Sequence, residues 1–311
     1  MSKSFLKSVI PFAAVSGEIY GGDPFRKPVK DTPLGLKPFP QNADKPVDKS
    51  GWYPVSPQLE LQKSPEAQRA LDFLQTQIGK KINIFEINDT TATKRGVLGG
   101  FDAASMSTPE FKTNVNVLLN SKNAGYETLF HEVGHARDPK LKENYAKRKS
   151  FNPQYIDSLR APSDRLSYFV NTTAQPRVES ETEAQAYSAD QLPRFSKENP
   201  DINIPYQKTF DDPWFKEYPA SYASQGIDRF YEQELYGGTR PAPFDENSPA
   251  AVRFMFPVDS AQRGLSFALD SNLQKTEKDI LERTREFIDE RLNPYQSKPT
   301  PAAPDYWASR K

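Results

Sequence analysis

Two histidines stand four residues apart in the sequence, and a glutamate follows the first of them: His131, Glu132 and His135. On an α-helix, positions i and i+4 lie one above the other on the same face, so both imidazoles can reach one metal ion. Glu132 lies about 100° further round the same helix, where its carboxylate can hold a water next to that metal. The spacing therefore predicts a helix that carries two metal ligands and a general base.

The composition makes this pattern more specific than the bare motif. The chain has 311 residues and only 2 histidines, and both fall in the motif. Two histidines placed at random would give this spacing and glutamate in roughly one chain in a few thousand. There is no cysteine, so neither a thiolate metal site nor a disulfide framework can form. The motif is typical of zinc hydrolases, and the third protein ligand to the metal must then be Asp or Glu.

Several acidic residues are candidates for that third ligand. A histidine six residues after His135, as one class of zinc peptidases has it, is excluded because that position is Leu141. Asp138 lies only one turn after His135; it could ligate the metal itself, but we expect it to hydrogen-bond a ligand or to end the helix. A glutamate from a later helix remains. The segment 178–190 is rich in helix formers and alanine, and we expect a slim helix there that Pro193 ends. Its glutamates are either a metal ligand or part of a solvated face: Glu179, Glu181 and Glu183.

Residues 64–195 resemble gluzincin metallopeptidases, in particular the ImmA/IrrE-type and HtpX-type peptidases. In these peptidases the HExxH helix is followed by a second helix with the pattern Glu-x-x-Ala-(Asp/Asn), and the segment 181–189 is similar to it. The resemblance implies a zincin-like domain in which Glu181 is the third ligand to Zn²⁺, with Glu183 as the alternative. Gln185 stands where the pattern has Asp or Asn, and it could still orient a ligand.

The activity that the resemblance implies is hydrolysis of a peptide bond. Zinc lowers the pKa of its water to about 7, and Glu132 accepts the proton as this water attacks the carbonyl of a protein or peptide substrate. No third histidine exists to stabilise the oxyanion, so a Tyr or Arg must do so, and Tyr187 is our candidate. We expect the strand 114–119 to be a sheet edge to which an extended substrate adds as a further strand.

The elements around the motif predict an α+β fold. Ser64 followed by Pro65 starts a helix that runs to about residue 79. Alternating patterns predict strands at 81–87, 95–101 and 114–119, which we expect to form a small, mainly antiparallel sheet. Asn123 is positioned to cap the motif helix, which should end near Arg137. Two short helices should follow, at about 142–149 and 155–170.

The chain divides by composition into five parts. Residues 1–62 form an extended proline-rich arm, with nine prolines in the first sixty positions. A zincin-like metallopeptidase domain (63–200), an aromatic and proline-rich lobe (201–270), a long charged helix (271–293) and a proline-rich tail (294–311) follow. Residues 5–17 also have features of a signal peptide, interrupted by Lys7. Proline-rich arms stay disordered unless they lie on another surface, so we predict contacts with other subunits of a large assembly, such as a virus particle.

Charge and hydropathy narrow the function classes. The 41 basic and 41 acidic residues cancel, which argues against a nucleic-acid partner, and no apolar run is long enough for a membrane span. We expect a zinc metallopeptidase, carried in a phage particle or secreted. The alternatives are a structural or docking protein whose zincin domain is inactive or only stabilised by metal, and a cell-wall hydrolase with the same metal chemistry. Glu132 favours an enzyme, because a purely structural zinc needs no base.

Overall fold

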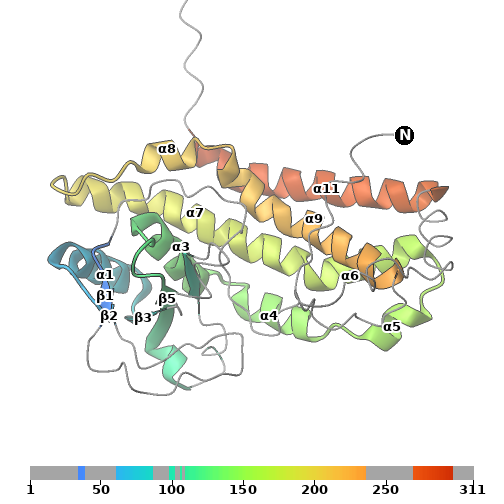
Figure 1. Ribbon diagram of the computed structural model, residues 1–311, viewed down its shortest axis with the longest axis horizontal. Coiled ribbons are helices and arrows are strands. Elements are labelled where there is room, and N and C mark those ends of the chain that lie inside the picture. The colour runs from blue at the N-terminus through green and yellow to red at the C-terminus, as the bar shows by residue number, and fades with distance from the viewer. Residues whose placement is uncertain are drawn as a thin grey trace, which may run out of the picture.

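The computed structural model describes residues 34–38, 61–86, 98–101, 106, 109–235 and 269–296. Most of the predicted arm and tail, the segment 5–17 and the second half of the predicted lobe lie outside these residues. The described part is mostly helical, with one small mixed three-stranded sheet, so the fold is broadly α+β as expected (Figure 1).

The sheet has the order β3-β5-β4, built from β3 (Lys81–Glu86), β4 (Gly99–Phe101) and β5 (Asn114–Leu119). β3 pairs with β5 in parallel along its full length, whereas the short β4 pairs with β5 in antiparallel. The expectation of a mainly antiparallel sheet was wrong, because the longer of the two strand pairs, β3 with β5, is parallel. The expectation that 114–119 is a sheet edge was also wrong, since β5 is paired on both sides.

A helix begins at Ser64, as the sequence predicts. The Ser64 hydroxyl accepts a hydrogen bond from the Ala67 amide, Pro65 is the first residue of α1 (Pro65–Ile78), and Gly79 ends the helix with a left-handed φ of 66°. The same hydroxyl donates to the Leu34 carbonyl, which lies just before the small β1–β2 pair (Lys37–Pro38 and Leu61–Gln62). The apolar stripe of α1 is buried: Ala67, Ala70, Leu71, Leu74 and Ile78.

The motif helix is α3 (Tyr126–Arg137), and it ends where the sequence predicts. Its first capping residue is Gly125 rather than Asn123, whose amide donates to the Asn120 carbonyl in the turn before the helix. At the other end the Asp138 amide donates to carbonyls of the last turn. α3 packs against β4, β5 and α7, so the sheet supports one side of the helix and α7 the other.

Three helices connect α3 to α7: α4 (Leu141–Lys149), α5 (Pro153–Ser158) and α6 (Pro162–Thr173). The single helix expected at 155–170 is therefore divided by a short break at 159–161. α7 (Gln175–Glu198) continues through Pro193, contrary to expectation. Proline removes one backbone hydrogen bond, but Leu192 and Phe195 on either side are fully buried, and this packing outweighs the loss.

The C-terminal half covers α7 with further helices. These are α8 (Tyr206–Phe210), α9 (Trp214–Leu235) and α11 (Ser271–Leu292), followed by the 3₁₀ turn Asn293–Tyr295. α7 and α11 run along the long axis of the molecule, and α9 packs against both (Figure 1). One hydrophobic core joins the sheet, α1, α3, α7 and the start of α9, and a second lies between α6, α9 and α11. Within the described residues, no helix is both long and apolar enough to cross a membrane.

Candidate metal centre

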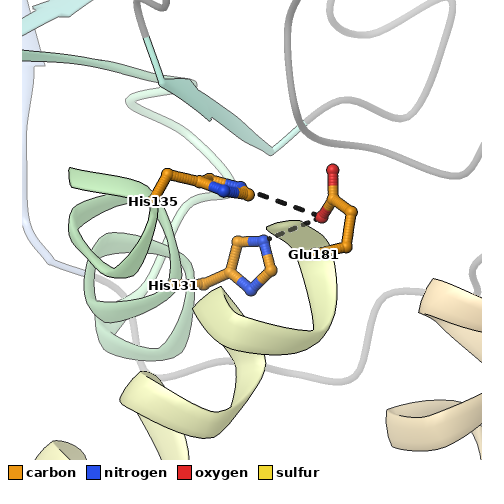
Figure 2. Close-up of side chains that lie close together, drawn as sticks. All are labelled: His131, His135 and Glu181. Carbon is orange, nitrogen blue, oxygen red and sulfur yellow. Dashed lines mark hydrogen bonds and ion pairs between the residues drawn. The ribbon is translucent and has the colours of Figure 1, made fainter. Parts of the chain in front are cut away.

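Two helices bring three potential ligands together: His131 and His135 from α3, and Glu181 from α7 (Figure 2). The Nε2 atoms of the two histidines lie 3.2 Å and 3.8 Å from the same oxygen, Oε2 of Glu181. Two ligand atoms that share a tetrahedral ion at about 2.0–2.1 Å lie about 3.3 Å apart. The spacing of these side chains therefore fits one metal ion bound by two nitrogens and one carboxylate oxygen.

A glycine allows the two helices to approach closely enough. A Cβ atom at Gly134 would lie 2.8 Å from the carbonyl oxygen of Ala184 and 2.9 Å from its Cα. Both atoms belong to the α7 backbone, which cannot move away as a flexible side chain can. Gly134 lies between the two histidines of the motif, and Ala184 lies one turn after Glu181. The close contact thus forms directly beside the three ligands.

The general-base candidate, Glu132, is buried in the same place. Only 2% of its surface is exposed, and a Cβ at Gly99 of β4 would lie 2.9 Å from its Oε1. Burial and the neighbouring charge of Glu181 raise the pKa of Glu132 well above its usual value. Oε2 of Glu132 and Oε1 of Glu181 are buried and accept no hydrogen bond from the described part of the chain. A divalent cation bound between two such buried carboxylates would stabilise both of them in their ionised form.

A chain of hydrogen bonds orients His135. The Ser180 hydroxyl donates to Oδ2 of Asp138 at 2.9 Å and lies 3.4 Å from Nδ1 of His135. With its proton on the Asp138 side, the Ser180 oxygen accepts from Nδ1–H, so Nε2 keeps its lone pair toward Glu181. Burial lowers the pKa of His135 to about 3, which leaves the imidazole neutral and able to bind a metal.

Asp138 ends α3, as predicted, but its Oδ2 is hydrogen-bonded to Ser180, which lies beside the ligand His135, rather than to a ligand itself. Its other oxygen accepts from the Lys140 amide at 2.8 Å. The role of Ser180 was missed. It directly precedes Glu181 in the sequence, but a serine inside a helix gives no signal of a distant carboxylate partner.

Glu183 and Gln185 of α7 form hydrogen bonds with α11 and α9 rather than with the potential metal ligands. Glu183 forms a double hydrogen bond with Arg291 of α11, at 2.8 Å and 2.7 Å, and takes no part in the ligand cluster. The Gln185 amide donates to the Phe215 carbonyl at 2.9 Å, so its hydrogen bond anchors the start of α9. Of the glutamates on this helix, Glu181 is the one whose carboxylate meets the histidines.

Tyrosines of α9, rather than Tyr187, lie next to the ligands. The Cβ of Tyr187 faces Gly134, and burial raises the pKa of its phenol to about 12. The ring centroid of Tyr218 is 6.1 Å from that of His131, and the hydroxyls of Tyr218 and Tyr222 are 3.0 Å apart. Burial, together with the charge of the nearby Glu181, raises the pKa of both phenols, so both stay protonated hydrogen-bond donors. Their i, i+4 spacing was the signal in the sequence that they share a helix face.

A second close contact holds α9 in this position. A Cβ at Gly226, one turn after Tyr222, would collide with the Cβ of Ala174, which lies between α6 and α7. α9 therefore crosses the start of α7 closely enough for its tyrosines to reach the site.

In comparisons with known proteins, no family model, no curated protein and no solved structure matches this chain.

Proposed function

We propose that this protein is a zinc-dependent peptidase of the His-His-Glu class with a zincin-like domain. The observation that carries the proposal is Glu132, a buried carboxylate next to two histidines and a second carboxylate, with one oxygen that accepts no hydrogen bond from the described chain. A metal that only stabilises the fold needs ligands and no base beside them. Two nitrogen donors and one carboxylate oxygen, with no thiolate available, are a donor set that catalytic zinc prefers.

The chain's own groups have distinct roles in this proposal. Zinc, when bound by His131, His135 and Glu181, supplies a Lewis acid that activates water and polarises the substrate carbonyl. Glu132 accepts a proton from the attacking water at its free oxygen and passes it to the leaving amine nitrogen. Tyr218 replaces Tyr187 as our candidate for the donor to the oxyanion, because its hydroxyl stays protonated and its ring lies beside His131.

The strand that we propose to pair with the substrate also differs from the one expected from the sequence. β5 is central, whereas β4 is at the margin of the described sheet and packs on α3. An extended protein or peptide substrate would therefore pair with β4, next to Glu132. Membership of a virus particle remains a prediction from the composition of the terminal arms, as does the alternative of a structural or docking role within such an assembly.

The proposal is tested with the full chain, its Glu132→Gln variant and the control Glu143→Gln, which changes an exposed glutamate on α4. We expect about one zinc per chain in all three proteins by elemental analysis. Hydrolysis of an unstructured protein substrate should fall about 10³-fold in Glu132→Gln alone, because the variant keeps the ligands and loses the base. Wild-type protein that binds no zinc, or undiminished hydrolysis by Glu132→Gln, would contradict the proposal.

A further inference from the structure

Arg177 is a partly buried arginine beside the metal centre whose charge helps to lower the pKa of Glu181, although it forms no ion pair with a carboxylate of the described residues. It lies one turn before Glu181 on α7, so both side chains leave the same face of the helix. Its Nε atom is buried and donates no hydrogen bond, and none of the ion pairs within the described residues includes it. Other arginines of the fold do end on carboxylates: Arg69, Arg165, Arg194 and Arg291.

The guanidinium of Arg177 instead lies over an aromatic ring of the site. Its central carbon is 5.4 Å from the ring centroid of Tyr222, whose hydroxyl is hydrogen-bonded to that of Tyr218. A cation over an aromatic face is held in position while its N–H groups remain able to donate. The arginine is therefore fixed near the site by a contact that leaves its hydrogen-bonding edge for another group.

Charge balance indicates what that group is. A divalent ion brings two positive charges, and Glu132 and Glu181 bring two negative ones, while histidines bind metals as neutral imidazoles. These charges cancel, and the remaining buried carboxylate of the site, Asp138, already accepts hydrogen bonds from Ser180 and from the Lys140 amide. No carboxylate of the described site is therefore hydrogen-bonded to the guanidinium. An anion is the natural partner, and a carboxylate matches the two parallel N–H groups of a guanidinium.

We propose that Arg177 binds a carboxylate of the substrate, so that the protein selects peptides with an acidic side chain or a free C-terminus close to the scissile bond. This inference rests on the proposed function, because the metal centre sets where the scissile bond lies. Arg177 is then a residue that determines specificity, and Tyr222 positions it. The same segment of α9 thus serves both the carboxylate and, through Tyr218, the reacting carbonyl.

Small chelating probes test the inference without requiring a known substrate. The probes are the monohydroxamates of malonic, succinic and glutaric acid, each compared with its primary amide, and calorimetry measures their binding to the zinc-loaded full chain. The hydroxamate binds the metal, and the three lengths place the carboxylate at increasing distances from it. We expect the acid of the best length to bind about ten- to a hundredfold more tightly than its amide, as for a hydrogen-bonded charged group.

Variants of Arg177 decide whether this arginine is the cause. In Arg177→Gln the acid-to-amide ratio should fall to about one while the amide still binds, and Arg177→Lys should keep part of the preference. Arg160→Gln, which changes an exposed arginine, should leave the ratio as in wild type. If Arg177 only supported the fold or the metal ligands, Arg177→Gln would weaken both probes equally. That result, or equal binding of acid and amide by wild type at every length, would overturn the inference and leave the proposed function standing. Failure of every hydroxamate to bind would overturn both.

Peptide pairs then distinguish the two sources of the carboxylate. One pair differs by Asp or Asn beside the scissile bond, with a blocked C-terminus, and the other differs by a free or amidated C-terminus. We expect one pair to show a preference for the charged form in wild type that Arg177→Gln abolishes. Equal hydrolysis within both pairs would overturn the inference.

Discussion

Glu181 and Glu183 lie two residues apart on α7, but their surroundings are opposite. Side chains two positions apart on a helix point about 200° away from each other, so Glu181 faces α3 and Glu183 faces α11. Glu181 is fully buried between two histidines, whereas Glu183 pairs with Arg291 at a partly exposed position. On the inner face of α7, burial and close backbone contact bring the three potential metal ligands together. The outer face uses an ion pair that mainly fixes the neighbouring helix.

The inner face should be the more sensitive of the two to small changes. The variant Gly134→Val places a side chain against the backbone of Ala184, where even a Cβ would be 2.8 Å from the carbonyl oxygen. We expect the free energy of unfolding to fall by about 3 kcal/mol, together with most of the zinc affinity, because α3 and α7 must separate. Denaturant unfolding and zinc titration measure the two effects.

Gly79→Ala is the matched control for that change. A Cβ there meets no atom within 4 Å, and the cost comes only from its left-handed φ of 66°. Its effect should be about 1 kcal/mol with unchanged zinc affinity. If Gly134→Val were as mild as this control, the close packing of the two helices would not be what forms the site.

Loss of the hydrogen bonds that link Nδ1 of His135 to Ser180 and Asp138 should have the next largest effect on zinc affinity. Ser180→Ala removes the link between His135 and Asp138, and leaves one Asp138 oxygen without its donor. Zinc affinity should fall about 10- to 100-fold, as for other groups that orient a metal ligand. Ser188→Ala on the same helix is the control, because its buried hydroxyl has no hydrogen-bond partner in the described structure. Equal zinc affinity in the two variants would show that Ser180 does not orient the ligand.

The outer face should tolerate change best. Arg291→Met breaks the ion pair with Glu183. The side chains of Arg291 and Glu183 are 47% and 24% exposed. Solvent and salt weaken such a pair, so the free energy of unfolding should fall by no more than about 1 kcal/mol. Zinc content should stay as in wild type. A loss of zinc in Arg291→Met would mean that α11 helps to hold the metal centre.

The sequence predicted the part of this structure that depends on local spacing. The motif helix, the helix that starts at Ser64, the three strands and the long charged helix all follow from patterns within a few turns of chain. The site residues on α3 could be named because a helix fixes how i and i+4 lie relative to each other. Glu181 could be named only through a resemblance between short segments.

What the sequence could not provide was the packing of distant segments. Strand patterns contain no information on register, so the parallel pairing of β3 with β5 and the central place of β5 were not predicted. Tyr218 lies 87 residues after His131, and only the crossing of α9 over α7 brings the two rings together. Pro193 looked like a helix end because the buried neighbours that keep the helix intact are not visible in local propensity.

We expect Glu181, and not Glu183, to complete a metal site with the two histidines. The most direct test is zinc titration of the full-length wild type, Glu181→Gln and Glu183→Gln, with folding of each checked by circular dichroism. We expect about one tightly bound zinc in wild type and in Glu183→Gln, and an affinity at least about 100-fold lower in Glu181→Gln. Full zinc affinity in Glu181→Gln, or its loss in Glu183→Gln, would contradict this expectation.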